Sequence, residues 1–110
     1  MTSFPIRLLI VDDHNLFRQG LIRILGDYEQ LQIVGQAAHG QDALALVGQL
    51  QPDVVLMDVN MPVLSGPDAV RQMRARFPSL PVVMLTVSER DDDLFDAIRA
   101  GAQGYLLKNV

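Results

Sequence analysis

The chain has 110 residues, 49% of them hydrophobic, which fits one globular domain built around one core. It contains no cysteine, which excludes disulfide frameworks, cysteine metal sites and thiol nucleophiles. The formal net charge of -4 at pH 7 argues against a surface for nucleic-acid phosphates, which needs clustered lysine and arginine.

The first half of the chain predicts two strands and two helices. RLLIV at 7–11 is a short aliphatic run, which favours a buried strand. Apolar residues then recur at helical spacing up to Gly26, where a helix is expected to stop. QIVGQA at 32–37 predicts a second strand, and a second helical stripe follows it. The two stripes are Leu16, Phe17, Leu21, Ile24 and Leu25, then Ala43, Leu44, Val47 and Leu50.

The second half continues the same alternation. DVVLM at 53–57, PVVMLTV at 81–87 and GYLLK at 104–108 predict three more strands. Pro67 suits the first turn of a third helix, and Pro78 suits its end. The stripes expected for the third and fourth helices are Ala69, Val70, Met73 and Phe77, then Leu94, Ala97 and Ile98 before Gly101.

Strands and helices therefore alternate along the whole chain. Most of the strand runs are apolar throughout, as in parallel sheets that are covered on both faces. The order βαβαβαβαβ predicts a three-layer α/β domain with a parallel sheet and right-handed crossovers. We expect residues 1–110 to form this single domain.

Four of the five predicted strands end in polar residues. Asp12 and Asp13 follow the first strand, Asp58 follows the third, Thr86 ends the fourth and Lys108 ends the fifth. In a parallel sheet the carboxyl ends of all strands lie at one edge, where open α/β sheets bind ligands. The sequence therefore predicts that three carboxylates, a hydroxyl and an ammonium converge.

This combination of side chains favours phosphoryl chemistry. Carboxylates packed together repel one another unless a cation compensates them. Mg²⁺ is the natural partner, because it takes oxygen ligands from one or two carboxylates and often binds phosphate as well. Asp12 and Asp13 form a pair suited to the metal, so Asp58, alone on the central strand, is the predicted nucleophile. Lys108 and Thr86 would hold the phosphoryl oxygens.

At these residues the sequence resembles the receiver domain of two-component response regulators. The resemblance covers essentially the whole chain, and the stretches DDHNLFRQGLIRIL and AGAQGYLLK are similar to the NarL/FixJ (LuxR-type) subfamily. It implies a flavodoxin-like, doubly wound, five-stranded parallel sheet in the order 2-1-3-4-5, in three αβα layers. The motifs that carry it are LLIVDDH, PDVVLMDVNMPVLSG, VVMLTVS and AGAQGYLLK.

The resemblance implies that a sensor histidine kinase donates a phosphoryl group to Asp58. Mg²⁺ would be bound by Asp13, by Asp58 and by the main-chain carbonyl of Asn60, with Asp12 acting through water. The domain would be a phosphoacceptor with slow self-catalysed phosphoryl transfer and hydrolysis, and not a turnover enzyme.

The same resemblance implies a conformational switch. Lys108 would pair with one phosphoryl oxygen, and Thr86 would swing inward to hydrogen-bond another. Tyr105 would turn inward as Thr86 moves, and the changed surface would regulate a transcriptional output. Homodimerisation on activation is expected.

The ends of the chain and its surroundings carry further expectations. The chain ends two residues after Lys108, so we expect the family's fifth helix to be absent from a C-terminally truncated piece. The resulting apolar surface is expected to lower stability or to cause self-association. A helix-turn-helix domain that binds DNA is expected to follow in the full-length protein. No apolar run is long enough to cross a bilayer, so we expect a soluble cytoplasmic protein without a membrane partner.

Two other function classes are compatible with parts of the pattern. A phosphatase or phosphotransferase of the haloacid dehalogenase type also uses an Asp nucleophile, Mg²⁺, Thr or Ser, and Lys. Its motif resembles D-x-D-x-T after the first strand, whereas Asp58 follows the third. A receiver-like interaction module that works without phosphorylation is the other alternative. His14 is interpreted as a residue that starts a helix, with tuning of the acidic pocket as its alternative role.

Overall fold

The computed structural model describes residues 5–58, 66–86 and 104–107, and of these 66, 67, 86 and 104–107 by their backbone alone. These ranges contain five strands and three helices. In chain order they are β1 (Ile6–Val11), α1 (Asn15–Gly26), β2 (Leu31–Ala37), α2 (Gly40–Leu50), β3 (Val54–Asp58), α3 (Gly66–Arg76), β4 (Val82–Thr86) and β5 (Gly104–Leu107). The fourth helix predicted around Leu94–Ile98 lies outside the described residues.

The five strands form one parallel sheet in the order β2-β1-β3-β4-β5. This order confirms the flavodoxin-like topology expected from the resemblance. It places β3 at the centre, with β1 on one side and β4 on the other. The chain therefore reverses direction across the sheet between β1 and β3, which is where such sheets bind ligands beyond their carboxyl ends.

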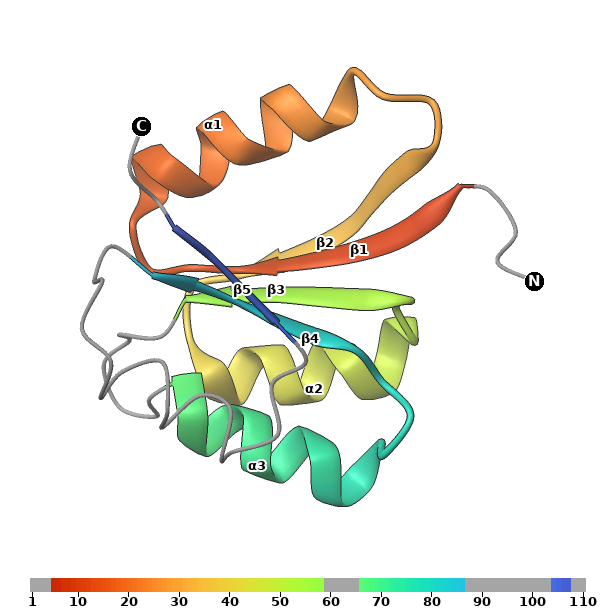
Figure 1. Ribbon diagram of the computed structural model, residues 1–110, viewed down its shortest axis with the longest axis vertical. Coiled ribbons are helices and arrows are strands. Elements are labelled where there is room, and N and C mark those ends of the chain that lie inside the picture. The colour runs from red at the N-terminus through yellow and green to blue at the C-terminus, as the bar shows by residue number, and fades with distance from the viewer. Residues whose placement is uncertain (1–4, 59–65, 87–103, 108–110) are drawn as a thin grey trace.

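Helices cover both faces of the sheet, as predicted (Figure 1). α1 lies on one face, while α2 and α3 lie together on the other. The predicted helix boundaries also agree closely: α1 ends at Gly26, and Pro67 lies in the first turn of α3, where its missing N–H costs nothing. No helix in the described ranges is both long and apolar enough to span a membrane.

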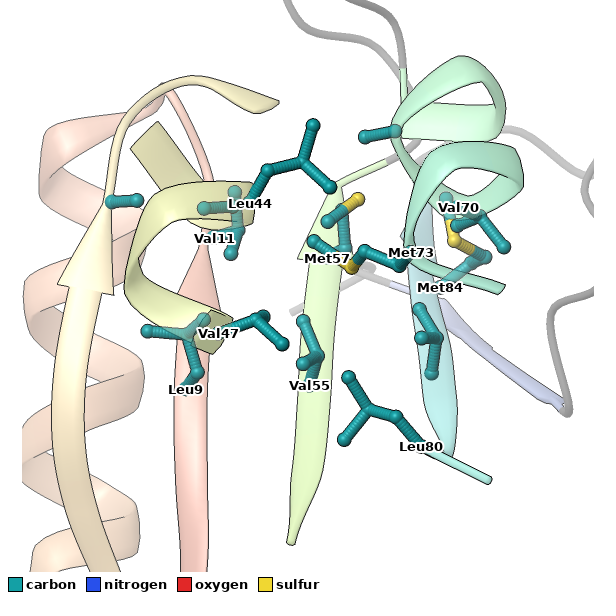
Figure 2. Close-up of a cluster of buried hydrophobic side chains, with 14 residues drawn as sticks. Leu9, Val11, Leu44, Val47, Val55, Met57, Val70, Met73, Leu80 and Met84 are labelled. Atoms are coloured by element: carbon teal, nitrogen blue, oxygen red, sulfur yellow. The ribbon is translucent and has the colours of Figure 1, made fainter. Parts of the chain in front are cut away.

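The main core lies between the sheet and the pair α2 and α3 (Figure 2). Alternate residues of β1, β3 and β4 point to this face, and the stripes predicted for the two helices meet them. Each fully buried aliphatic side chain contributes about 1.5–3 kcal/mol through removal from water. The labelled members are Leu9, Val11, Leu44, Val47, Val55, Met57, Val70, Met73, Leu80 and Met84.

The apolar stripe predicted for α1 is only partly correct. Leu21 and Leu25 are partly buried, but Leu16 is 88% exposed and Ile24 is 61% exposed. Ile22, which the predicted stripe leaves out, is partly buried instead. Helical spacing fixes which residues lie near one another, but the packing of α1 on the sheet decides which side of the helix is covered.

Candidate metal site at the carboxyl edge of the sheet

Two of the predicted acids are buried side by side at the carboxyl edge. Asp12 directly follows β1 and has no exposed surface, while Asp58 is the last residue of β3 and is 3% exposed. β1 and β3 are neighbours, with Val11 opposite Met57 in the register. The two carboxylates therefore lie next to each other at the ends of neighbouring strands. Charged groups are rarely buried unless something compensates them.

Asp13 and His14 complete the group. Asp12, Asp13, His14 and Asp58 each offer one ligand atom, and these four atoms all lie within 4.8 Å of one another. The structure therefore brings together all three acids predicted to form the site. It adds a histidine ring that our interpretation of the sequence assigned mainly to the start of a helix.

His14 starts α1, and its ring lies beside the acidic cluster. It is the N-cap residue of α1, but its side chain makes no capping hydrogen bond. Its ring instead approaches the acids, with Nδ1 at 3.1 Å from Asp12 Oδ1, 3.5 Å from Asp13 Oδ1 and 3.6 Å from Asp58 Oδ2. The predicted position of His14 at the start of a helix is confirmed, and tuning of the acidic pocket stays a prediction.

Asp12 is fixed by hydrogen bonds around the turn that joins β1 to α1. Its carboxylate accepts the His14 backbone N–H at 2.8 Å, and its own backbone N–H donates to the Ala37 carbonyl at 3.0 Å. The Arg18 guanidinium donates from Nη1 to the Asp12 carbonyl at 2.5 Å. A site residue held by several such bonds is oriented before any ligand arrives.

Arg18 is a supporting residue that our interpretation of the sequence missed. Its Nε donates to Gln36 Oε1 at 2.8 Å, and its Nη2 donates to Asn15 Oδ1 at 2.8 Å. It thereby connects the start of α1, the end of β2 and the backbone of Asp12. The sequence offered one signal for this role. Arg18 is a charged residue next to Phe17 and one helical turn before Leu21, both of which belong to the apolar stripe predicted for this helix.

The donor set fits a hard divalent cation. Mg²⁺ prefers carboxylate, carbonyl and water oxygens, and three carboxylates offer such oxygens here. Asp13 Oδ1 is buried and makes no hydrogen bond within the described part of the chain. Like charges this close to one another favour a bound cation. Asp12, Asp13 and Asp58 are therefore the described residues that could hold the metal.

The other predicted site residues are described in part or not at all. Thr86 ends β4, and its backbone pairs with Leu107 of β5, while Tyr105 pairs with Met84. These backbone positions put both residues on the two strands beyond β3, with Thr86 at the carboxyl end of its strand. Asn60 and Lys108 lie outside the described residues.

Comparison with known proteins identifies the family. The family model for the response regulator receiver domain matches residues 8–110. The response regulator GacA of Pseudomonas aeruginosa is 48% identical over 105 residues, which cover 96% of this chain and 49% of that protein. The transcriptional regulatory protein DegU of Brevibacillus brevis is 38% identical, with 96% of this chain and 44% of that protein covered. The chain thus spans about half the length of these curated relatives.

Solved structures agree with the sequence comparison. The signal receiver domain of the response regulator NarL from Mycobacterium tuberculosis superposes with a TM-score of 0.92 at 31% identity. That match covers 98% of this chain and 87% of the other. A LuxR-family response regulator from Aurantimonas gives a TM-score of 0.89 at 30% identity, covering 94% and 74% of the two chains. The chain belongs to the response regulator receiver domain family of two-component systems, with relatives of the NarL/FixJ and LuxR type among transcriptional regulators.

Proposed function

We propose that this domain is a phosphorylation-controlled switch in which Asp58 accepts a phosphoryl group from a sensor histidine kinase. The observation that supports it best is the gathering of Asp12, Asp13 and Asp58 within one small volume at the carboxyl edge. A lone acid at the end of a strand is commonly a turn residue. Three acids from two neighbouring strands instead supply both a nucleophile and a place for a cation.

The proposed transfer is a displacement at phosphorus. An oxygen of the Asp58 carboxylate forms a bond to the phosphorus, and the bond from phosphorus to the donor's imidazole nitrogen breaks. The electron pair leaves with the imidazole. Bound Mg²⁺ would supply positive charge beside the phosphoryl oxygens, held by Asp13, Asp58 and the Asn60 carbonyl, with Asp12 acting through water.

The protein's own residues orient the nucleophile. Asp58 is buried and ends a central strand, which restricts its rotation. We propose that Lys108 pairs with a phosphoryl oxygen and that Thr86 hydrogen-bonds another. Tyr105 would respond to the movement of Thr86 and change the surface formed near β4 and β5. Switching would then follow from a few new charge-assisted hydrogen bonds at the phosphoryl group.

The output proposed for the full-length protein is regulation of transcription. Relatives of this chain are named as transcriptional regulators, and each is about twice as long as the part matched here. We propose that residues 1–110 act as the receiver domain and that a DNA-binding segment elsewhere in the protein carries the output. Activation would occur in the cytoplasm and would favour a homodimer.

Intact mass spectrometry tests the role of Asp58. The wild type and Asp58→Asn are incubated with acetyl phosphate and Mg²⁺, and the mass increase is followed over time. We expect one phosphate on the wild type and none on the variant, which keeps a similar shape but lacks the carboxylate nucleophile. Equal uptake by both proteins would contradict the assignment. Continuous turnover of a phosphomonoester by the wild type would favour a true phosphatase instead.

A further inference from the structure

The ring of His14 faces the acidic cluster with one nitrogen. Nδ1 lies between 3.1 and 3.6 Å from an oxygen of each of Asp12, Asp13 and Asp58. The His14 side chain is 61% exposed. One ring nitrogen of a solvent-accessible side chain therefore lies close to all three carboxylates.

The spacing of these atoms matches neighbours in one coordination shell. Adjacent ligands about 2.1 Å from an octahedral ion lie about 3.0 Å apart, and opposite ones about 4.2 Å apart. Ligands about 2.0 Å from a tetrahedral ion lie about 3.3 Å apart. The four donor atoms all lie within 4.8 Å of one another, which is close to these ligand separations.

A nitrogen ligand changes which ion is preferred. Mg²⁺ favours oxygen ligands, whereas imidazole suits divalent transition metals, whose affinity rises from Mn²⁺ through Co²⁺ and exceeds that of Mg²⁺ at mixed nitrogen and oxygen sites. The 3.1 Å contact also fits a simple hydrogen bond from Nδ1–H of His14 to Asp12, in which the ring only orients that carboxylate. The two roles predict different responses to the choice of metal.

We propose that His14 Nδ1 joins the carboxylates as a ligand when a divalent transition-metal ion binds, and that it raises the affinity of the site for such ions while leaving Mg²⁺ binding unchanged. The proposal rests on the proposed function, because it concerns the metal of the same site. It assigns to His14 a role in metal choice, separate from the acceptance of the phosphoryl group by Asp58.

Calorimetric titration with Mn²⁺, Zn²⁺ and Mg²⁺ tests the proposal. The proteins are the wild type, His14→Asn and His39→Ala. Asparagine is a favourable N-cap residue, so His14→Asn removes the ring nitrogen while the start of α1 is retained. His39 is the only other histidine in the chain and is the N-cap residue of α2, likewise without a side-chain capping bond.

We expect His14→Asn to weaken Mn²⁺ and Zn²⁺ binding by about tenfold or more, since losing even a supporting partner of a metal ligand has an effect of that size. Mg²⁺ binding is expected to change by less than about twofold, because Mg²⁺ makes little use of nitrogen. His39→Ala is expected to bind all three ions as the wild type does. Pulsed electron paramagnetic resonance of bound Mn²⁺ should detect a coupled imidazole nitrogen in the wild type that is absent from His14→Asn.

Other outcomes overturn the proposal and can be told apart. Equal weakening of all three ions would leave His14 only the orienting hydrogen bond, and unchanged binding would leave it no role at the metal. If either result came with normal phosphate uptake on Asp58, His14 would not be a metal ligand, and the proposed function would be unaffected. A wild type that binds none of the three ions would remove both this assignment and the Mg²⁺-dependent part of the proposed function.

Discussion

Two aspartates lie at opposite ends of the central strand β3, and their surroundings differ. Asp53 directly precedes β3, is exposed, and accepts the Arg7 backbone N–H at 2.8 Å. Asp58 ends the same strand, is buried, and lies among other carboxylates. Both follow the simple rule that acids occur where strands meet loops. The comparison teaches that the surroundings of an acid, and not its position at a strand end, indicate chemistry.

Asp53 lies among hydrogen-bonding groups that hold the turn before β3. The Arg7 guanidinium donates from Nη1 to the Gln51 carbonyl at 2.8 Å, so the residues around the start of β3 are joined by complementary groups. Gln51 is the C-cap residue of α2 and has a positive φ of 49°. The hydrogen bond from Arg7 to its carbonyl holds the turn between α2 and β3. At the other end of β3, Asp58 lies beside Asp12, Asp13 and His14. A bound cation there would offset the repulsion among the three carboxylates.

The largest effect is expected from the acids of the cluster. Asp13→Asn should weaken Mg²⁺ binding by about 10- to 100-fold, the range seen when groups around a metal are removed. Asp53→Asn should change it by less than about twofold. Calorimetry of the two variants beside the wild type measures the difference. If Asp53→Asn weakened Mg²⁺ binding as much as Asp13→Asn, the claim that Mg²⁺ binds at the carboxyl end of β3 would be contradicted.

Asp13→Asn should also differ from the wild type in its stability without metal. Removing Asp13 relieves repulsion among like charges, so the free energy of unfolding of Asp13→Asn should rise in a buffer free of divalent ions. Adding Mg²⁺ should stabilise the wild type more than the variant, because a ligand stabilises the folded state more when it binds more tightly. Urea unfolding with and without Mg²⁺ measures the free energy of unfolding of both proteins and so tests both expectations. A variant less stable than the wild type in both buffers would show that Asp13 is a structural residue.

Arg18 should have an intermediate effect, because it supports the site without lying in the group of donor atoms. Arg18→Met keeps much of the aliphatic side chain but removes hydrogen bonds to Asp12, Gln36 and Asn15. The free energy of unfolding should fall by about 1–2 kcal/mol, and Mg²⁺ binding should weaken by a few fold. Gln19→Ala is the matched control, since Gln19 lies on the same helix and also donates to Gln36 Oε1. Equal losses of Mg²⁺ affinity in both variants would argue against a special role for Arg18.

The smallest effect is expected from Asp53. Asp53→Ala removes the acceptor of one exposed hydrogen bond, which should lower the free energy of unfolding by about 0.5–1.5 kcal/mol. Phosphate uptake from acetyl phosphate should match that of the wild type, because the affected turn lies at the amino end of β3. Chemical denaturation and intact mass spectrometry give the two values. A variant that folds but fails to take up phosphate would break the distinction between Asp53 and Asp58.

Much of the fold could be predicted because the local pattern and the tertiary structure agree. The five apolar runs became the five strands within one or two residues at each end, since buried parallel strands leave little room for polar residues. The geometry of a parallel sheet predicted that Asp12, Asp13 and Asp58 lie at one edge, and they meet there because β1 and β3 are neighbours. The strand order came instead from the resemblance to the family, because alternation of strands and helices permits several orders.

The parts that could not be predicted depend on side-chain directions. Whether His14 faces solvent or the acids is decided by the turn between β1 and α1, and apolar patterns carry no information about that turn. Arg18 is similar, because its partners come from the end of β2 and the backbone of Asp12. The misplaced stripe of α1, with Leu16 and Ile24 exposed, shows that helical spacing leaves the rotation of a helix on its sheet open.

The most direct test of the central claim is to locate the phosphoryl group on the chain. The protein is phosphorylated with acetyl phosphate and Mg²⁺, treated with borohydride to reduce the acyl phosphate, and digested for peptide mass mapping. We predict that the reduced carboxyl group is found at Asp58 and at no other acid, because Asp58 alone combines the central strand with the cluster. Reduction at Asp12, Asp13 or Asp53, or no reduced residue after phosphate uptake, would contradict the account.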